Sequence, residues 1–287
     1  MKKTLLSWMA PFLARRISLF GLIVLAVIVI AAALAPWIAP YDPLSYDPIA
    51  RLLPPGIEHW FGTDHYGRDT FSRVIYGARL ALIIGVGVVG FALVIGVPIG
   101  IVSALYPRVG LLLMRMIDVL MAFPALLLAL GLIVILGRGV ENAIIAVGVV
   151  YLTTTVRIVY GVSLKLREET YVEAAVSLGA RGVRIIFRHI LPNLISPLLV
   201  QASFVFAFAQ LQAASLDFLG LGAPPEIPSW GNALSESRIY ITHAPWLLIF
   251  PGMMIVLTAF SLNLVGDALR DRLDPRFKDT FTAGKKG

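Results

Sequence analysis

Few side chains in this sequence are spaced for catalysis. The four histidines include no pair at the spacing with which one helix face binds a metal ion. No Gly-x-x-x-x-Gly-Lys-Ser/Thr segment, the loop that holds the phosphates of ATP, is present. The sequence also has no cysteine, which excludes disulfides, thiol catalysis and thiolate metal sites. We therefore expect no catalytic residue, no metal site and no cofactor in this chain.

Ionisable residues at the middle of a membrane span would indicate ion coupling or intramembrane hydrolysis. Asp118, Arg157, Asp217 and Asp267 instead lie nearer the ends of the apolar runs. A secondary transporter usually places such groups near the middle of the bilayer. A proton-coupled carrier is therefore the alternative from another class of protein. Measuring whether transport needs ATP or a proton gradient would distinguish it.

A mechanical function is indicated by residues 173–192. Glu173-Ala174-Ala175 favours a helix, Gly179 can end it in a left-handed conformation, and Leu191-Pro192 marks the entry into a further helix. A helix, a turn and a helix on the membrane surface form an elbow that a soluble partner can grip. The alternative is an ordinary amphipathic connector, because Glu-Ala-Ala is common in helices.

The other polar candidates flank or enter the apolar runs. Gln201 and Gln212 are eleven residues apart, about three helical turns, so they share a face, while Gln210 lies nearly opposite. That shared face is a candidate lining of a pathway, and hydrogen bonds between helices are the alternative. Asp118 is expected to pair with Arg115, three residues earlier.

Composition identifies an integral membrane protein. The chain of 287 residues is 58% hydrophobic and only 14% charged, and its mean hydropathy is +0.85. Runs long enough to cross about 30 Å of hydrocarbon predict six transmembrane helices. They cover about residues 17–38, 80–105, 111–136, 142–164, 194–216 and 246–266. Pro124 is expected to kink the third span, and Arg157 to reach toward an interface.

The basic residues set the orientation. Lys2, Lys3, Arg15 and Arg16 precede the first span, which places both termini in the cytoplasm by the positive-inside bias. Of the 24 Lys and Arg, only six then lie outside: Arg51, Arg68, Arg73, Arg79, Arg138 and Arg238. The net charge of +7 is scattered near span ends, so we expect a lipid bilayer and no nucleic acid as the partner. Cleavage of residues 2–35 as a signal peptide is the weaker alternative.

The elbow resembles the coupling loop of bacterial ABC importer permeases. Its pattern is Glu-Ala-Ala, three residues, Gly, nine residues, Ile, any residue, Leu-Pro, and His189 is the one departure, standing where Ile is usual. Further motifs resemble the dipeptide, oligopeptide and nickel group: residues 59–64 and 67–73, residues 218–222 and 228–231, and the tail at 263–276. The long first external loop and the Asp274-Pro275-Arg276 tail resemble the C-type subunit.

That resemblance implies a type I importer permease fold, with an amino-terminal segment (1–16), a first span, an external loop with a short helix (39–79), a five-helix core (80–268) and a tail (269–287). The core would contain the coupling loop (165–193) and an external loop (217–245). The implied partners are a homologous permease, two cytoplasmic ATPase subunits that bind ATP and Mg, and an external substrate-binding protein, all at a bacterial or archaeal inner membrane. Peptides are the expected substrates; nickel chelates, glutathione and oligosaccharides are the alternatives.

The external motifs carry a second set of candidate residues. Thr63 or Asp64 is expected to cap a short helix over residues 66–76, whose flank carries Arg68, Asp69 and Arg73. A local salt-bridge network is favoured there over contact with substrate. Trp230 lies in the Gly- and Pro-rich segment 220–245, which is expected to form a re-entrant or capping loop. Docking of the binding protein, closing of an external gate and simple anchoring stay open for this region.

Overall fold

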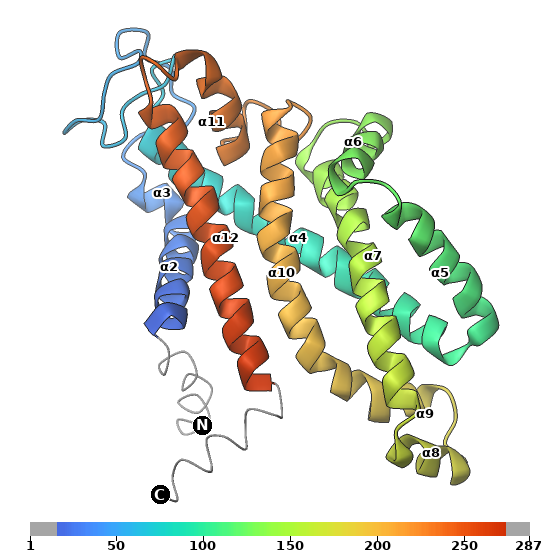
Figure 1. The fold of residues 1–287 in the computed structure, drawn as a ribbon. Helices are drawn as coiled ribbons and strands as arrows, with labels where there is room; N and C mark the ends of the chain where they lie inside the picture. Colours follow the sequence, from blue (N-terminus) through green and yellow to red (C-terminus); the bar gives the residue numbers. More distant parts are fainter. Residues whose placement is uncertain (1–15, 274–287) are drawn as a thin grey trace, which may run out of the picture.

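The computed structural model describes residues 16–273, which fold almost entirely into helices (Figure 1). The helices are α2 (Arg16–Ala33), α3 (Ala35–Ile38), α4 (Thr70–Leu105), α5 (Pro107–Met121), α6 (Ala125–Leu136), α7 (Val140–Arg167), α8 (Thr170–Ser177), α9 (Val183–Ile185), the π-helical η1 (Ile186–Ile190), α10 (Leu191–Phe218), α11 (Trp230–Ser237), the 3-10 turn η2 (Arg238–Tyr240) and α12 (Trp246–Leu273). No strand occurs within residues 16–273. The basic amino-terminal residues 1–15 and the Asp274-Pro275-Arg276 motif lie outside the described residues.

Five helices are long and apolar enough to cross a bilayer: α2, α4, α7, α10 with the turns before it, and α12. Four of them contain the predicted second, fourth, fifth and sixth spans, and α2 with α3 covers the first. The predicted short helix over residues 66–76 is not separate, because α4 is continuous over 36 residues from Thr70. Residues 269–273, predicted as tail, continue α12.

The predicted third span is broken. α5 and α6 meet at an angle of 96° across residues 122–124, so residues 111–136 do not form one kinked helix. Pro124 has an extended backbone, with φ −55° and ψ 134°, and the residue before a proline is held away from helical conformation. The helix therefore ends before Pro124 and restarts after it, as the amide of Leu128 donates to the Pro124 carbonyl at 3.0 Å.

α4 and α7 pack closely against each other. A Cβ atom on Gly100 of α4 would lie 2.6 Å from Cβ of Val159 in α7, closer than real side chains approach. Glycine at this position lets the two backbones come together, as small residues commonly do where spanning helices meet. The main cluster of buried apolar side chains joins other parts of α4 and α7 to α6 and α10.

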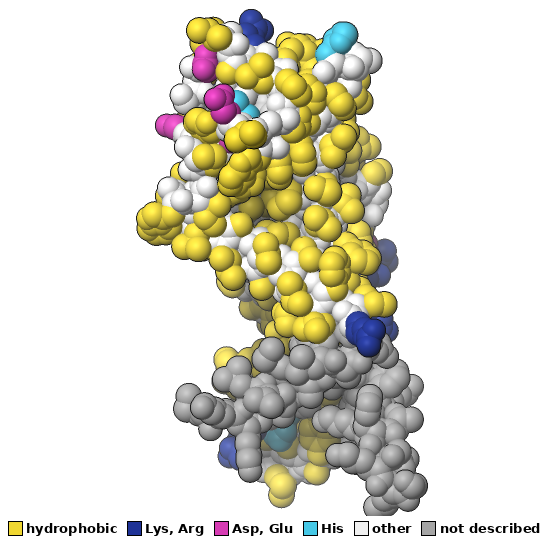
Figure 2. All heavy atoms as spheres, turned by 90° about the vertical axis from the view of Figure 1, so that its left-hand side faces the viewer, with side chains coloured by type: hydrophobic (Ala, Val, Ile, Leu, Met, Phe, Trp, Pro, Cys, Tyr) yellow, Lys and Arg dark blue, Asp and Glu magenta, His cyan; other side chains and the backbone are white. Residues whose placement is uncertain are grey.

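The segments predicted to carry function, α8 with α9, and α11, lie at opposite ends of the bundle. Figure 1 shows α8 and α9 at the end where α2 begins and α12 finishes, and α11 at the other end. Figure 2 shows hydrophobic side chains over the middle of one face, with charged side chains near its two ends. An apolar band between two charged ends suits a protein that crosses a bilayer.

Candidate functional site

The elbow predicted at residues 173–192 consists of α8, a turn, α9, η1 and the first two residues of α10. The end of α8 has the hydrogen bonds of a Schellman motif: the Ala180 amide donates to the Ala175 carbonyl, and the Gly179 amide to the Val176 carbonyl, each at 2.9 Å. Gly179 has φ +87°, so the predicted left-handed backbone is confirmed. This turn fixes the direction in which the chain leaves α8.

One side of the elbow is packed against three spanning helices. Arg167 at the end of α7 donates from Nη1 to the carbonyl of Ala104 in α4 at 2.8 Å. A buried apolar cluster joins the elbow to α4, α7 and α10; its members are Ile101, Val159, Val172, Ala180, Ile185, Ile190 and Leu194. A displacement of the elbow must therefore move the ends of these helices or disrupt this cluster.

The other side of the elbow exposes large apolar side chains. Leu178 is 90% exposed, Val183 69% and Phe187 65%, and Glu173 and Ala174 of α8 are exposed too. Three arginines are exposed on the same segment: Arg181, Arg184 and Arg188. Apolar side chains interspersed with charge form an exposed surface of the kind that contacts with a protein or a membrane use.

Leu191-Pro192 marks the entry into α10, as predicted, because α10 begins at Leu191 and Pro192 lies in its first turn. The chain is helical from Val183 to Phe218, through η1 and into α10. Proline has no amide hydrogen for the bond to the preceding turn, and the wider π-helical turn η1 lies directly before it. Pro192 is exposed and Leu191 half-buried in this unbroken connection, which joins the elbow to α10.

His189 takes part in contacts between the two arms of the elbow. Its ring lies 6.1 Å from the ring of Tyr171 in α8. Asn193 donates from Nδ2 to the His189 carbonyl at 2.7 Å and to the Tyr171 hydroxyl at 3.3 Å. Asn193 thus bridges α8 to the start of α10.

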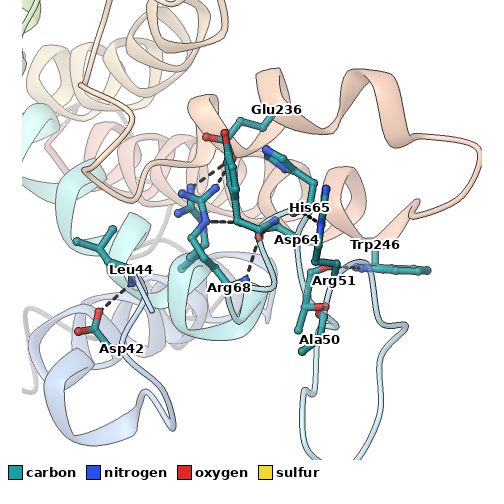
Figure 3. A network of polar contacts seen from close by, with 12 residues as sticks. Asp42, Leu44, Ala50, Arg51, Asp64, His65, Arg68, Glu236 and Trp246 are labelled. Atoms are coloured by element: carbon teal, nitrogen blue, oxygen red, sulfur yellow. Dashed lines mark hydrogen bonds and ion pairs between the residues drawn. The ribbon is translucent and has the colours of Figure 1, made fainter. Parts of the chain in front are cut away.

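The opposite end of the molecule holds a charge cluster, formed by Asp64, Arg68, Arg73 and Glu236. Arg68 donates from Nε to Asp64 at 2.6 Å and from Nη2 to Glu236 at 2.7 Å (Figure 3). Arg73 nitrogens lie 3.7 Å from Asp64 and 3.6 Å from Glu236. The cluster joins the segment before α4 to α11, which carries Glu236.

Three side chains of the charge cluster are buried, and the fourth, Glu236, is partly exposed. The side chains of Arg68, Arg73 and Asp64 are 3%, 5% and 7% exposed, and that of Glu236 is 23% exposed. Two positive and two negative charges balance one another. A salt-bridge network is therefore present, but its acidic members are Asp64 and Glu236. Glu236 could not be found from the sequence, because it lies 168 residues from Arg68 and on no periodic pattern.

Asp69 has a separate task from its neighbour Arg68. Its Oδ2 accepts from the Ser72 amide at 2.7 Å, which caps α4, and its Oδ1 lies 2.9 Å from His59 Nδ1. The prediction that Thr63 or Asp64 caps this helix was therefore wrong. Thr63 Oγ1 accepts from the Leu53 amide instead, in the loop before α4.

Trp230 is buried at the start of α11. Its side chain donates from Nε1 to the Val74 carbonyl at 2.9 Å, and only 4% of the residue is exposed. The ring therefore holds α11 on α4 rather than presenting itself to a partner. That Trp230 belongs to an external gate, in which α11 would move, stays a prediction.

A cavity of about 20 Å³, room for one water-sized molecule, lies beside the charge cluster. Polar atoms of His65, Thr70 and Arg73 are buried there without a hydrogen-bond partner among the described residues. Burial lowers the pKa of His65, and Asp64 and Glu236 oppose that shift. Asp64, His65 and Glu236 lie close enough together to hold a cation. Arg68 and Arg73 already neutralise both carboxylates, which disfavours a metal ion.

The three glutamines of α10 differ in surroundings. Gln210 is buried, and its Nε2 donates to the Ala81 carbonyl of α4. Gln201 is partly buried and donates from Nε2 to Thr154 of α7 at 3.4 Å. Gln212 is also partly buried, with an Nε2 that has no hydrogen-bond partner among the described residues. Lining of a pathway by Gln201 and Gln212 stays a prediction.

Asp118 pairs with Arg157, and not with Arg115 as predicted. Arg157 Nη2 donates to Asp118 Oδ1, which links α7 to α5. Arg157 therefore does not extend toward a membrane interface as a lone charge, because it is paired with Asp118. The partners are 39 residues apart in sequence, which local spacing could not reveal.

Comparison with known proteins gives two family matches. Residues 96–279 match the family described as the binding-protein-dependent transport system inner membrane component. Residues 7–55 match the family described as the N-terminal TM domain of oligopeptide transport permease C. Together the two matches cover the elbow, α2, the end of α4 and all helices after it.

Named relatives cover nearly the whole chain. A putative peptide transport system permease protein of Brucella suis is 48% identical over 264 residues, 92% of this chain and 89% of that protein. The glutathione transport system permease protein GsiD of Escherichia coli is 42% identical over 257 residues, 88% of this chain and 84% of that protein. A solved structure of the MetNI methionine ABC transporter in inward-facing conformations has a TM-score of 0.59 and 18% identity, and the alignment covers 70% of this chain and 96% of that chain.

Proposed function

Because the chain belongs to the family of binding-protein-dependent transport system inner membrane components, we propose that it forms the pathway of a peptide importer together with a homologous second permease. It is the C-type permease, since its first residues match the permease C domain. Two ATPase subunits bind ATP and Mg and drive the cycle, and an external binding protein delivers di- or oligopeptides.

The elbow is the observation that carries this proposal. Its outer side exposes Leu178, Val183 and Phe187, and its inner side is packed against α4, α7 and α10. A partner that grips the outer side therefore acts on three spanning helices at once. An ATPase at the cytoplasmic face is the partner that the family membership implies.

Coupling follows from the unbroken connection between the elbow and α10. Closure of the ATPase subunits on ATP displaces α8 and α9, and the continuous helix from Val183 to Phe218 carries that displacement toward α11. Packed helices move as rigid bodies, so a shift at one end becomes a shift of the gate region at the other. The chain contributes a lever, and the ATPase subunits contribute the hydrolysis.

Peptides are the preferred substrate class because the relative in Brucella suis is named as a peptide permease. Glutathione is a second candidate, since the relative in Escherichia coli is named for it and is nearly as similar. Both are zwitterions with peptide bonds, so the binding protein is expected to decide between them.

Reconstitution tests this function. The full chain, coexpressed with the second permease, the ATPases and the binding protein, is placed in proteoliposomes, and uptake of a radiolabelled dipeptide is measured. We expect uptake that needs ATP and persists when a protonophore removes the proton gradient. Uptake driven by a proton gradient without ATPase subunits would instead establish the carrier alternative.

A further inference from the structure

The ion pair between Asp118 and Arg157 is half-exposed within two apolar helices. The side chain of Arg157 is 51% exposed and that of Asp118 is 47% exposed. By contrast, three of the four charged side chains in the charge cluster are less than a tenth exposed. The pair therefore presents both of its charges at the surface of this chain.

Arg157 lies deep within α7, and Asp118 lies in the last turn of α5, beside the break between α5 and α6. At about 1.5 Å per residue, Arg157 is about 15 Å along α7 from Arg167, while Asp118 is about 4.5 Å from the end of α5 at Met121. For Arg157 this is within about 5 Å of the middle of α7. Arg157 thus lies nearer the middle of its helix than expected.

Charged side chains at this depth do not face lipid. Transfer of a single charged side chain to the centre of a bilayer is strongly unfavourable, and such groups face a bundle interior or a water-filled cavity. The exposed side of this pair must therefore face either the second permease or the translocation pathway.

The neighbouring surface favours the pathway. Thr154, Arg157, Gly161 and Lys165 recur every three or four residues, so they share one face of α7. A Cβ atom on Gly161 would meet nothing within 4 Å, and Lys165 is exposed. Gln201 of α10 adjoins this face through its bond to Thr154. A polar stripe with open space beside it differs from the aliphatic surface that faces lipid.

We propose that Asp118 and Arg157 form a binding subsite for the termini of a zwitterionic peptide in the pathway. Arg157 binds the terminal carboxylate through charge-assisted hydrogen bonds, and Asp118 binds the terminal ammonium group. Without a peptide the two side chains pair with each other, which keeps the stripe neutral. The subsite deepens the proposed function and rests on it.

Binding of a peptide replaces the ion pair between Asp118 and Arg157 with two ion pairs, one between each side chain and a peptide terminus. Each charge of the resting pair gains a partner of opposite sign on the substrate, so no charge is left unpaired in a site of low dielectric. The half-exposed geometry permits this exchange without unfolding, since both groups are already accessible. Lys165 continues the same face toward the end of α7 and attracts the carboxylate along it.

The test compares peptide transported with ATP hydrolysed. The reconstituted complex carries Arg157→Met together with Asp118→Leu, which removes both charges and leaves neither partner unpaired. The matched control is Arg138→Met, at an exposed arginine between α6 and α7. Uptake of radiolabelled alanyl-alanine and ATP hydrolysis are measured with saturating binding protein. We expect uptake per ATP to fall at least about tenfold in the double variant, the effect of losing charge-assisted hydrogen bonds, and to stay unchanged in the control.

The other outcomes overturn the subsite in distinguishable ways. Normal uptake per ATP in the double variant assigns the pair a purely structural role. Loss of the second permease on purification of the double variant assigns the pair to the contact between permeases. Absence of dipeptide uptake by the unsubstituted complex overturns the proposed function, and the subsite with it.

Discussion

The two ends of this molecule differ in which side chains they bury and which they expose. At the end that carries α11, the charge cluster buries three ionisable side chains, leaves Glu236 partly exposed and pairs all four within the chain. At the end that carries the elbow, Leu178, Val183 and Phe187 are exposed although they are apolar. The charges at one end are paired within the chain, and the other end exposes an apolar surface for which we propose an ATPase partner.

This contrast distinguishes stability from coupling. A buried salt bridge becomes strongly destabilising when one partner is lost, because the remaining charge has no water around it. An exposed apolar surface contributes little to the stability of its own chain and much to association. Substitutions at the charge cluster should therefore change unfolding, and substitutions at the elbow should change the interaction with the ATPases.

The largest effect is expected for Arg68→Ala. The substitution leaves buried Asp64 and partly exposed Glu236 with Arg73 as their one remaining cationic partner in the cluster. Loss of one partner from a buried network typically costs about 3–5 kcal/mol. The midpoint of thermal unfolding of the purified complex should fall by about 10 °C. Arg138→Ala, at an exposed arginine, is the control and should leave the midpoint unchanged. An unchanged midpoint for Arg68→Ala would show that the cluster is not what holds α11 in place.

Gly179→Val should have a smaller effect on unfolding and a large one on transport. A Cβ atom at Gly179 meets nothing within 4 Å, so only the backbone conformation at φ +87° opposes valine. A left-handed backbone costs an ordinary residue about 1–2 kcal/mol, and more for a β-branched one. Dipeptide uptake per ATP should fall. Gly179→Asn is the matched control, because asparagine tolerates this conformation; equal uptake by both variants would contradict the lever.

Glu173→Lys should leave the unfolding midpoint nearly unchanged and weaken the complex. Glu173 is exposed in the first turn of α8, so its own chain hardly depends on it, while a basic site on an ATPase would meet a reversed charge. Less ATPase should copurify with the variant, and the loss should depend on salt, since exposed charges are screened. Copurification equal to that of Glu173→Gln at every salt concentration would remove Glu173 from the contact.

The sequence predicted the parts of the fold that depend on neighbouring residues. The spans at residues 80–105, 142–164, 194–216 and 246–266 follow from long apolar runs, and all lie within observed helices. The left-handed backbone of Gly179 follows from its place after a short helix. A proline alone does not distinguish a kink from a break, so the 96° turn at Pro124 was missed.

Contacts between distant segments could not be predicted in the same way. Glu236 joins the charge cluster, and Arg157 pairs with Asp118, only because helices far apart in sequence pack together. Asp64 and Asp69 are equally good caps by composition, and the bonds of Asp64 to Arg68 leave Asp69 to cap α4. Periodicity gives the face on which a residue lies, and only packing shows what that face meets.

The smallest effect is expected from the protonation of His65 at the edge of the charge cluster. Burial lowers the pKa of His65 below its ordinary value of 6.5, and Arg68 and Arg73 act in the same direction. The unfolded chain therefore binds a proton at a pH where the folded chain does not. Stability contributed by neutral His65 is present above about pH 6.5 and is lost as the pH falls below it.

Thermal unfolding between pH 5.5 and 7.5 tests this sign. The midpoint of the unsubstituted complex should fall more on acidification than that of His65→Gln, because glutamine has no proton to gain in this range. His243→Gln, at an exposed histidine near the same end, is the control and should keep the full dependence. The difference should be modest, since His65 is only partly buried and Asp64 and Glu236 favour its charged form. Equal pH dependence in all three proteins would mean that the cluster is open to water, which would remove the contrast between the two ends.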